Sequence, residues 1–133
     1  MSLLEACLSV AVITTSSMIA IPKVIHVRQN YVLNAAARDV ATKMHLARIN
    51  AVARNRDCRL RTTSAASYVV ECAVPVWAVI ESVVLPRGIT IAGTSPEFHR
   101  RGNVVPAGTM TLSNQAGLQK RVIVNNIGRI RVQ

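Results

Sequence analysis

The chain has 133 residues, which is enough for a long helix and one small domain but not for two large domains. Lys and Arg number 16 against 6 Asp and Glu, so the formal charge is +10 and the pI is about 11.1. This balance favours polyanionic partners such as nucleic acid or an anionic surface. The sequence has no His/Cys/Asp cluster at metal-ligand spacing, no glycine-rich phosphate loop and no serine elbow, so we expect no enzyme, catalytic residue, metal or cofactor.

The N-terminal stretch, residues 1–22, is predominantly apolar and carries one formal charge, Glu5. The 17 residues from Ala6 to Pro22 have no charge and would span about 25 Å as a helix, close to the thickness of a bilayer core. The hydroxyl residues 14–17 make this a marginal membrane span. A carboxylate inside such a segment costs about 2.5–3.5 kcal/mol on insertion scales, so Glu5 needs a partner or a purpose.

The first five residues, Met-Ser-Leu-Leu-Glu, resemble the mature N-terminus of the type IV pilin superfamily, in which glutamate is the fifth residue. The resemblance implies that prepilin peptidase has removed a leader, that Met1 is the processed and N-methylated residue, and that Glu5 pairs with the Met1 amine of a neighbouring subunit. Met1 departs from the usual phenylalanine, and an initiator methionine would look the same. The alternative is a signal anchor or signal peptide, although the segment has Glu5 in place of the basic n-region that those segments need.

Residues 23–54 have helical periodicity, with an apolar face that includes Leu33, Val40 and Met44. Pro22 lacks a backbone donor, so the helix should kink or unwind just before it, and the resemblance to pilins implies an extended stretch there in the filament. The alternative is a simple bend in a continuous helix. We expect a helical part over 1–54, with 1–22 as its membrane or filament-core segment, and a β-rich domain over 55–133.

Cys58 and Cys72 flank a strand–turn–strand pattern whose turn falls at residues 64–66. If the two cysteines face each other, Arg59 lies opposite Glu71, which pairs opposite charges across the strands. Cysteines opposed in this way can bridge, and we therefore expect a disulfide between Cys58 and Cys72. The alternative is a pair of buried thiols.

Further strands are expected over 76–85, 89–92, 109–113, 120–124 and 129–133, with a loop over 96–108. A long N-terminal helix packed on a small antiparallel sheet is an α+β fold.

The C-terminal part resembles the GspH/FimT family of pseudopilins and minor pilins, through Phe98, Gly108 and the element Gly128-Arg129-Ile130-Arg131. On a strand, Arg129 and Arg131 would lie on one face, about 6.6 Å apart, while Ile130 and Val132 would face the core. The resemblance to FimT implies that Arg129 and Arg131 bind DNA.

Charge alone suggests that four further residues extend this patch, namely Lys120, Arg121, Arg100 and Arg101. Binding would be independent of sequence and would fall steeply with salt. The alternative is a solvated edge strand whose arginines prevent aggregation.

Three functions follow from these observations. The first is a structural subunit of an extracellular type IV pilus-like filament that assembles with copies of itself and with other pilins. The second is a tip pilin that captures DNA in natural transformation, and the third is a minor pseudopilin of a type II secretion system. In each case the protein would lie in the inner membrane before assembly, and afterwards in a periplasmic or cell-surface filament.

Overall fold

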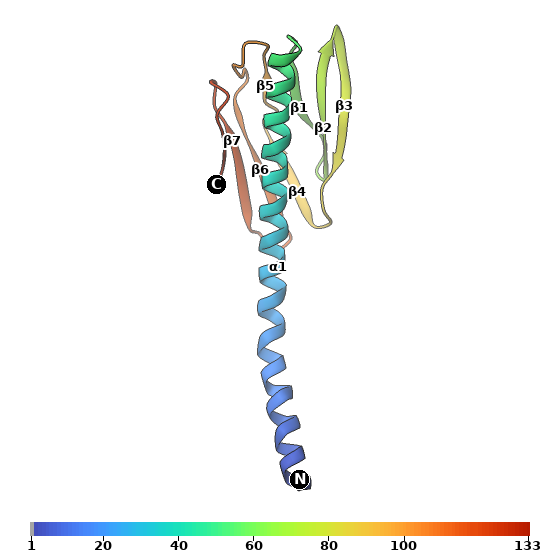
Figure 1. The fold of residues 1–133 in the computed structure, drawn as a ribbon, viewed down its shortest axis with the longest axis vertical. Helices are drawn as coiled ribbons and strands as arrows, with labels where there is room; N and C mark the ends of the chain where they lie inside the picture. Colours follow the sequence, from blue (N-terminus) through green and yellow to red (C-terminus); the bar gives the residue numbers. More distant parts are fainter. Residues whose placement is uncertain (1) are drawn as a thin grey trace. The chain divides into compact units, whose positions relative to one another are not determined.

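The computed structural model describes residues 2–133, apart from the side chains of Ile19, Ala20 and Pro22. One helix is followed by eight strands (Figure 1). The elements are α1 (Leu3–Ala53), β1 (Cys58–Ser64), β2 (Ser67–Val74), β3 (Val76–Val84), β4 (Ile89–Gly93), β5 (Glu97–Phe98), β6 (Gly108–Asn114), β7 (Gln119–Val124) and β8 (Ile130–Val132). The chain forms two compact units, Met1–Tyr31 and Val32–Gln133, which are described separately.

In the second unit, the C-terminal half of α1 packs on the strands through one face. Its buried residues recur at steps of three and four, as the sequence predicts, and several have no exposed surface. They are Leu33, Ala36, Ala37, Val40, Ala41, Met44, Ala47 and Ala51. Because five of the eight are alanine, the helix can approach the strands closely, and buried residues from both sheets join the same core.

The first sheet has the strand order β3-β2-β1-β5. The β1–β2 hairpin has the predicted register, with Cys58 opposite Cys72, Arg59 opposite Glu71 and Leu60 opposite Val70. Leu60 and Cys58 are fully buried, so their packing in the core determines which side chains of β1 point inward and which point outward. The predicted register is therefore confirmed from Cys58 to Thr62, whereas the turn is shorter than expected because Ser64 still pairs with Ser67 after an irregularity.

The second sheet has the order β4-β6-β7-β8, all antiparallel. The predicted strands in this region are present within one or two residues of their expected ends. In β7, Val122 and Val124 are buried while the neighbouring Arg121 is exposed, which fixes the face that each residue presents. The helix and strands together give the predicted α+β fold.

Three details differ from the sequence prediction. The strands form two four-stranded sheets rather than one, and the expected loop over 96–108 contains the two-residue strand β5. A strand this short has no detectable alternation, and pairing with β1 creates it. Val132, expected in the core, is 40% exposed because it ends the edge strand β8, whereas Ile130 packs against the core.

Candidate functional site

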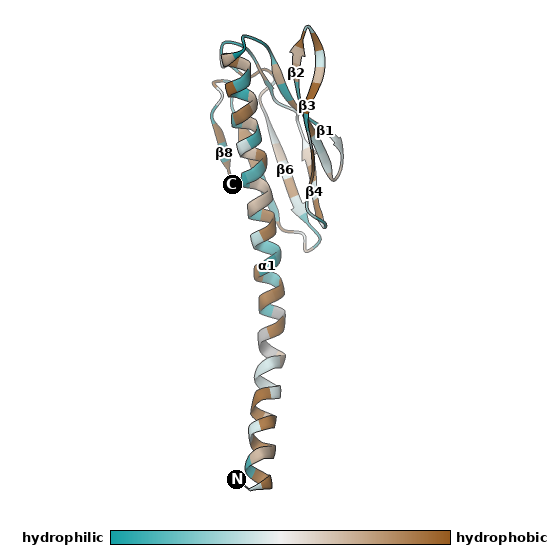
Figure 2. Cartoon of the chain, turned by 45° about the vertical axis from the view of Figure 1, so that its right-hand side comes forward, coloured by the Kyte–Doolittle hydropathy of each residue, from teal (hydrophilic) through white to brown (hydrophobic). Residues whose placement is uncertain are grey.

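The helix of the N-terminal unit presents large apolar side chains that are mostly exposed in the isolated chain, including Leu3, Leu8 and Ile13. Among the described residues, α1 is the one helix that is long and apolar enough to cross a membrane, a test that signal sequences also pass. The most apolar stretch of 18 residues in this helix has a mean hydropathy of 1.8, and none of its residues is buried. Figure 2 shows the apolar colouring concentrated near the start of this helix.

Glu5 lies in the first turn of α1, where a carboxylate interacts favourably with the positive end of the helix dipole. Its backbone N–H faces the Ser2 hydroxyl oxygen at 3.3 Å, as in an N-terminal cap. Met1, the predicted partner and processing site, lies outside the described residues. The pairing of Glu5 with a neighbouring subunit therefore stays a prediction.

The hydroxyl residues in the middle of this segment donate to carbonyls one turn earlier in the helix. Thr14 and Thr15 donate to Val10 and Ala11 at 3.0 and 2.9 Å, and the two following serines make similar bonds at 2.8 Å. Each hydroxyl is thus satisfied within the helix, which lowers the cost of placing it in an apolar environment. None of these bonds reaches the carbonyl of Met18, four residues before Pro22, so these hydroxyls do not compensate the backbone group that proline frees.

The helical assignment of the backbone continues through Pro22 without a break. The expected local unwinding is absent from the described backbone of this chain. The observed backbone agrees with the alternative of a continuous helix. The extended stretch expected inside a filament stays a prediction.

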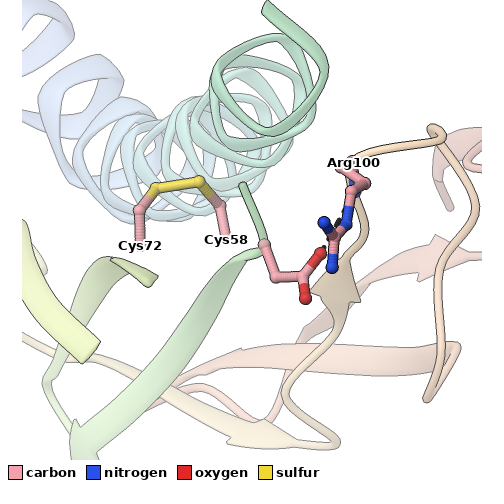
Figure 3. Close-up of a disulfide and its surroundings, with 4 residues drawn as sticks. Cys58, Cys72 and Arg100 are labelled. Atoms are coloured by element: carbon pink, nitrogen blue, oxygen red, sulfur yellow. Dashed lines mark hydrogen bonds between the residues drawn. A yellow bond between two sulfur atoms is a disulfide. The ribbon is translucent and has the colours of Figure 1, made fainter. Parts of the chain in front are cut away.

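The expected disulfide is present between Cys58 and Cys72, with 4.0 Å between the Cα atoms. Figure 3 shows it next to helix α1, with Arg100 on a neighbouring segment. Both cysteines are fully buried, and the bond joins the first two strands where the chain leaves the helix. The bond therefore reinforces the hairpin end nearest the loop that carries Arg100.

The structure places Arg129 and Arg131 at the exposed edge of the second sheet. Arg131 lies in the edge strand β8 opposite Ile123, and both arginines are exposed. Arg129 lies just before the strand rather than in it, and its N–H donates to Asn125 Oδ1 at 2.8 Å. The side chain of Arg131 projects from the face opposite the core, as alternation predicts, because Val124 and Val122 pair with its two neighbours.

Lys120 and Arg121 are neighbours in β7 and therefore point to opposite faces of the sheet. Arg121 lies opposite Thr111 on one side and Gln133 on the other, so it is on the outer face and diagonal to Arg131. Lys120 lies opposite the buried Leu112 on the inner face and is partly buried. A single flat contact surface can use Arg121 but not both residues.

Arg100 and Arg101 are exposed and lie in the turn between β5 and β6. This turn adjoins the β7–β8 turn, because the N–H of Val104 donates to the Asn126 carbonyl at 2.9 Å. Arg100 is held from the other side, since its N–H donates to Asp57 Oδ1 at 3.2 Å. The tertiary fold thus brings two basic segments, far apart in sequence, to one end of the domain.

Arg48, which the sequence analysis did not single out, joins these two turns. From the helix, its Nε faces the Gly102 carbonyl and its Nη2 faces the Ile127 carbonyl, both at 3.3 Å. A Cβ on Gly128 would lie only 2.6 Å from Arg48 Nε, and Gly128 has a φ of 81°. The glycine of the Gly-Arg-x-Arg element is therefore needed to admit Arg48, a role that its sequence neighbours cannot reveal.

Charge is distributed unevenly along the fold. Glu97 is the last acidic residue, and all six predicted DNA-binding residues follow it, so residues 98–133 carry six cations and no carboxylate side chain. The basic residues of the first sheet are compensated, because Arg59 and Arg61 both bind Glu71 at 2.8 and 2.6 Å. Hydrogen bonding to Arg61, followed by Arg59, lowers the pKa of Glu71 against the opposing effect of burial.

In the described residues, no ion pair forms on any of the six predicted DNA-binding side chains. These six cations without an ion pair thus lie in or beside the second sheet and in the turn between β5 and β6. An edge strand with arginines also resists pairing with other sheets. The position of Arg129 and Arg131 therefore agrees both with DNA binding and with the alternative that these arginines prevent aggregation.

Comparisons with known proteins agree with this fold. A family model described as "Type II transport protein GspH" matches residues 36–128. No curated protein sequence matches the chain.

Two solved structures illustrate the similarity. The minor pseudopilin EpsH from the type II secretion system of Vibrio cholerae is 14% identical, with a TM-score of 0.66, covering 76% of this chain and 95% of that one. The type IV minor pilin FimU of Pseudomonas aeruginosa is 16% identical, with a TM-score of 0.62, covering 76% and 92% of the two chains. At these identities the likeness shows a shared pilin-like fold.

Proposed function

Because this chain belongs to the GspH family of pilin-like proteins, we propose that it is a filament subunit that also binds nucleic acid without sequence preference. Members of this family are structural proteins of pilus-like assemblies rather than enzymes. The proposal has two parts, assembly through the N-terminal helix and binding through the second sheet. Each part has its own supporting observation and its own test.

Assembly is supported by the exposed apolar helix with one carboxylate near its start. Side chains such as Leu3 and Leu8 are 85% and 65% exposed, and this surface needs a bilayer or other helices around it. Once buried among helices, Glu5 would be strongly unfavourable without a cation, and the free amine of a neighbouring Met1 supplies one. The pair would then fix the register between subunits.

The matched test of assembly compares Glu5→Ala with Ser9→Ala. Ser9 lies one turn further along and donates to the Glu5 carbonyl, so its replacement disturbs the same turn without removing the carboxylate. We expect Glu5→Ala to abolish filaments in electron micrographs while Ser9→Ala retains them. Normal filament numbers with Glu5→Ala would refute the role of Glu5.

Nucleic-acid binding is supported by the single observation that six cations and no carboxylate side chain follow Glu97. Arg129 and Arg131 are exposed, and a guanidinium binds phosphate oxygens through parallel donors with a permanent charge. Arg121 adjoins Arg131 on the outer face of the sheet and extends the surface. Only four residues are aromatic, so base stacking contributes little and phosphate contacts dominate.

The test of binding compares Arg129→Ala/Arg131→Ala with Arg38→Ala/Arg54→Ala. The second pair removes the same charge from two exposed positions, Arg38 in α1 and Arg54 directly after it. Each lost phosphate contact lowers the slope of log K against log salt by about 0.9, so the first pair should reduce the slope by about 2 and the second by little. Equal effects of the two pairs would show that net charge alone, and not this edge, binds DNA.

A second candidate function is a minor pseudopilin that primes a short periplasmic fibre of a type II secretion system. The description of the matching family model and the likeness to EpsH favour it. Such a subunit would be rare in the fibre and would not need DNA. Counting this chain per filament by quantitative mass spectrometry, together with the identity of neighbouring genes, separates this candidate from a pilus subunit.

A further inference from the structure

Three potential metal ligands converge where the chain passes from the helix into the first sheet. Asp57 precedes β1, and Glu97 and His99 flank the buried Phe98 of β5. One ligand atom from each side chain lies within 4.8 Å of the other two. The sequence predicts no such cluster, because Asp57 is 40 residues away from Glu97 in the chain.

The register of the sheet produces this convergence. Cys58 lies opposite Phe98 and Arg59 opposite Glu97, so one step further along the pair Asp57 falls opposite His99. Cys58 and Phe98 are both fully buried and occupy the core face. Alternation then places their neighbours on the other face, where side chains are accessible to a solvent ion.

The ring contacts of His99 leave one nitrogen directed at the Asp57 carboxylate. Its Nε2 lies 3.2 Å from the Val105 carbonyl, and because a carbonyl only accepts, Nε2 must carry the hydrogen. Its Nδ1 lies 3.3 Å from Asp57 Oδ1. In a neutral imidazole, Nδ1 then presents a lone pair to an anionic oxygen, an arrangement that a cation between the two atoms would stabilise. A metal-bound histidine has this same arrangement, with the second nitrogen donating to a backbone carbonyl.

We propose that Asp57, Glu97 and His99 form a surface site for a divalent transition-metal ion of the Zn²⁺ type. Bonds of about 2.0–2.1 Å in tetrahedral geometry require ligand atoms about 3.3 Å apart, which is the distance between His99 Nδ1 and Asp57 Oδ1. An imidazole among the ligands favours Zn²⁺ over Ca²⁺ or Mg²⁺. Water would complete the coordination, since three protein ligands leave a position open.

The remaining contacts are compatible with such a site. Asp57 Oδ1 accepts the Arg100 N–H at 3.2 Å, which leaves its second lone pair and all of Oδ2 available. In the described part of the chain, the Glu97 carboxylate has no side-chain partner, because Arg59 binds Glu71 instead. The guanidinium groups of Arg100 and Arg101 are exposed, so water and salt screen their repulsion of a cation.

Binding would tie the exit of α1 to β5, and through the neighbouring turn to the segment that carries Arg100 and Arg101. The site thus gives a way for a metal ion to stabilise the end of the domain where the basic segments meet. It does not depend on DNA binding or on filament assembly. The ion binds only the folded arrangement, so it raises the melting temperature in proportion to the logarithm of its concentration.

The test is calorimetric titration of the full chain in detergent micelles with ZnCl₂, after treatment with a chelator. The variants are His99→Gln and Glu97→Gln, which remove one ligand each, and the control is His45→Gln, which removes an exposed helical histidine. We expect one equivalent of Zn²⁺ to bind the parent chain and the control with the same affinity. Loss of supporting groups alone costs 10–100-fold in metal affinity, so each ligand variant should lose at least about tenfold.

Unchanged affinity in either ligand variant would overturn the three-ligand site, as would the absence of binding to the parent chain. Equal weakening by His45→Gln would overturn it too, because the ion would then bind exposed histidines in general. Thermal unfolding provides a second measurement. Zn²⁺ should raise the melting temperature of the parent chain and of His45→Gln but not of His99→Gln, and a shift retained in His99→Gln would contradict the proposal.

Discussion

Gly128→Ala should destabilise the domain far more than Gly117→Ala, although both glycines have nearly the same φ angle. Their φ angles are 81° and 80°, a left-handed region that costs an alanine about 1–2 kcal/mol. Around Gly117 a Cβ would meet nothing within 4 Å. At Gly128 the same atom would lie 2.6 Å from Arg48 Nε and 2.8 Å from the Gly102 carbonyl oxygen.

The additional cost at Gly128 follows from the bonds that the displaced groups make. Arg48 must withdraw from the carbonyls of Gly102 and Ile127, and bonds to a charged donor contribute about 1.5–3 kcal/mol each. Both bonds are long, at 3.3 Å, and Arg48 can rehydrate, so we take about 2–3 kcal/mol for the two together. The expected total is about 3–5 kcal/mol for Gly128→Ala against about 1–2 kcal/mol for Gly117→Ala.

Urea unfolding of the full chain in detergent measures this difference through the fluorescence of Trp77, the single tryptophan. Each kcal/mol also lowers the melting temperature by about 4–8 °C in a domain of this size. Comparison of Gly128→Ala in the parent and Arg48→Ala backgrounds isolates the contact, since the excess should largely vanish without Arg48. Equal destabilisation by Gly128→Ala and Gly117→Ala would refute the packing role of Arg48.

Three further predictions follow from the contacts in the second unit. Replacing Cys58 and Cys72 by serine should lower the free energy of unfolding by about 3 kcal/mol, the value for a disulfide that closes a loop of about 15 residues. Cys7→Ser in the helix should leave the free energy of unfolding unchanged, because Cys7 is a free cysteine. A urea unfolding curve that does not respond to the double change would contradict this prediction. The pKa of Glu71 is lowered in the folded state, so the stability that its ion pairs contribute is complete above the unfolded pKa near 4.5 and is lost as pH falls through the lower folded pKa. Melting temperatures measured from neutral to acid pH should therefore fall less steeply for Glu71→Gln than for the parent chain. Parallel curves for the two proteins would argue against the ion pairs. Arg48→Met should speed hydrogen exchange of the Val104 amide, which donates to the Asn126 carbonyl between the two basic turns. Exchange of the Leu85 amide, which donates to the Ala66 carbonyl, serves as the control and should not change. Unchanged exchange at Val104 would show that Arg48 does not hold the turns together.

Local patterns predicted much of this fold because the physical causes are themselves local. The apolar face of the helix from Leu33 to Ala51 follows from its 3.6-residue period, and the hairpin register follows from pairing Arg59 with Glu71. The exposure of Arg131 follows from alternation with Ile130 in the last strand. Each of these signals lies within a window of about 20 residues.

The sequence by itself determined the apolar leading helix with its acidic fifth residue, the hairpin stapled by Cys58 and Cys72, and the six cations that follow the last carboxylate. Only the tertiary structure decided that the strands divide into two sheets and that Arg48 reaches Gly102 and Ile127. The reason is that contacts between residues 40 to 80 positions apart depend on how helix and sheets pack, and packing leaves no periodic trace in the chain. Asp57 and His99 meet for the same reason, through the pairing of a strand too short to be recognised alone.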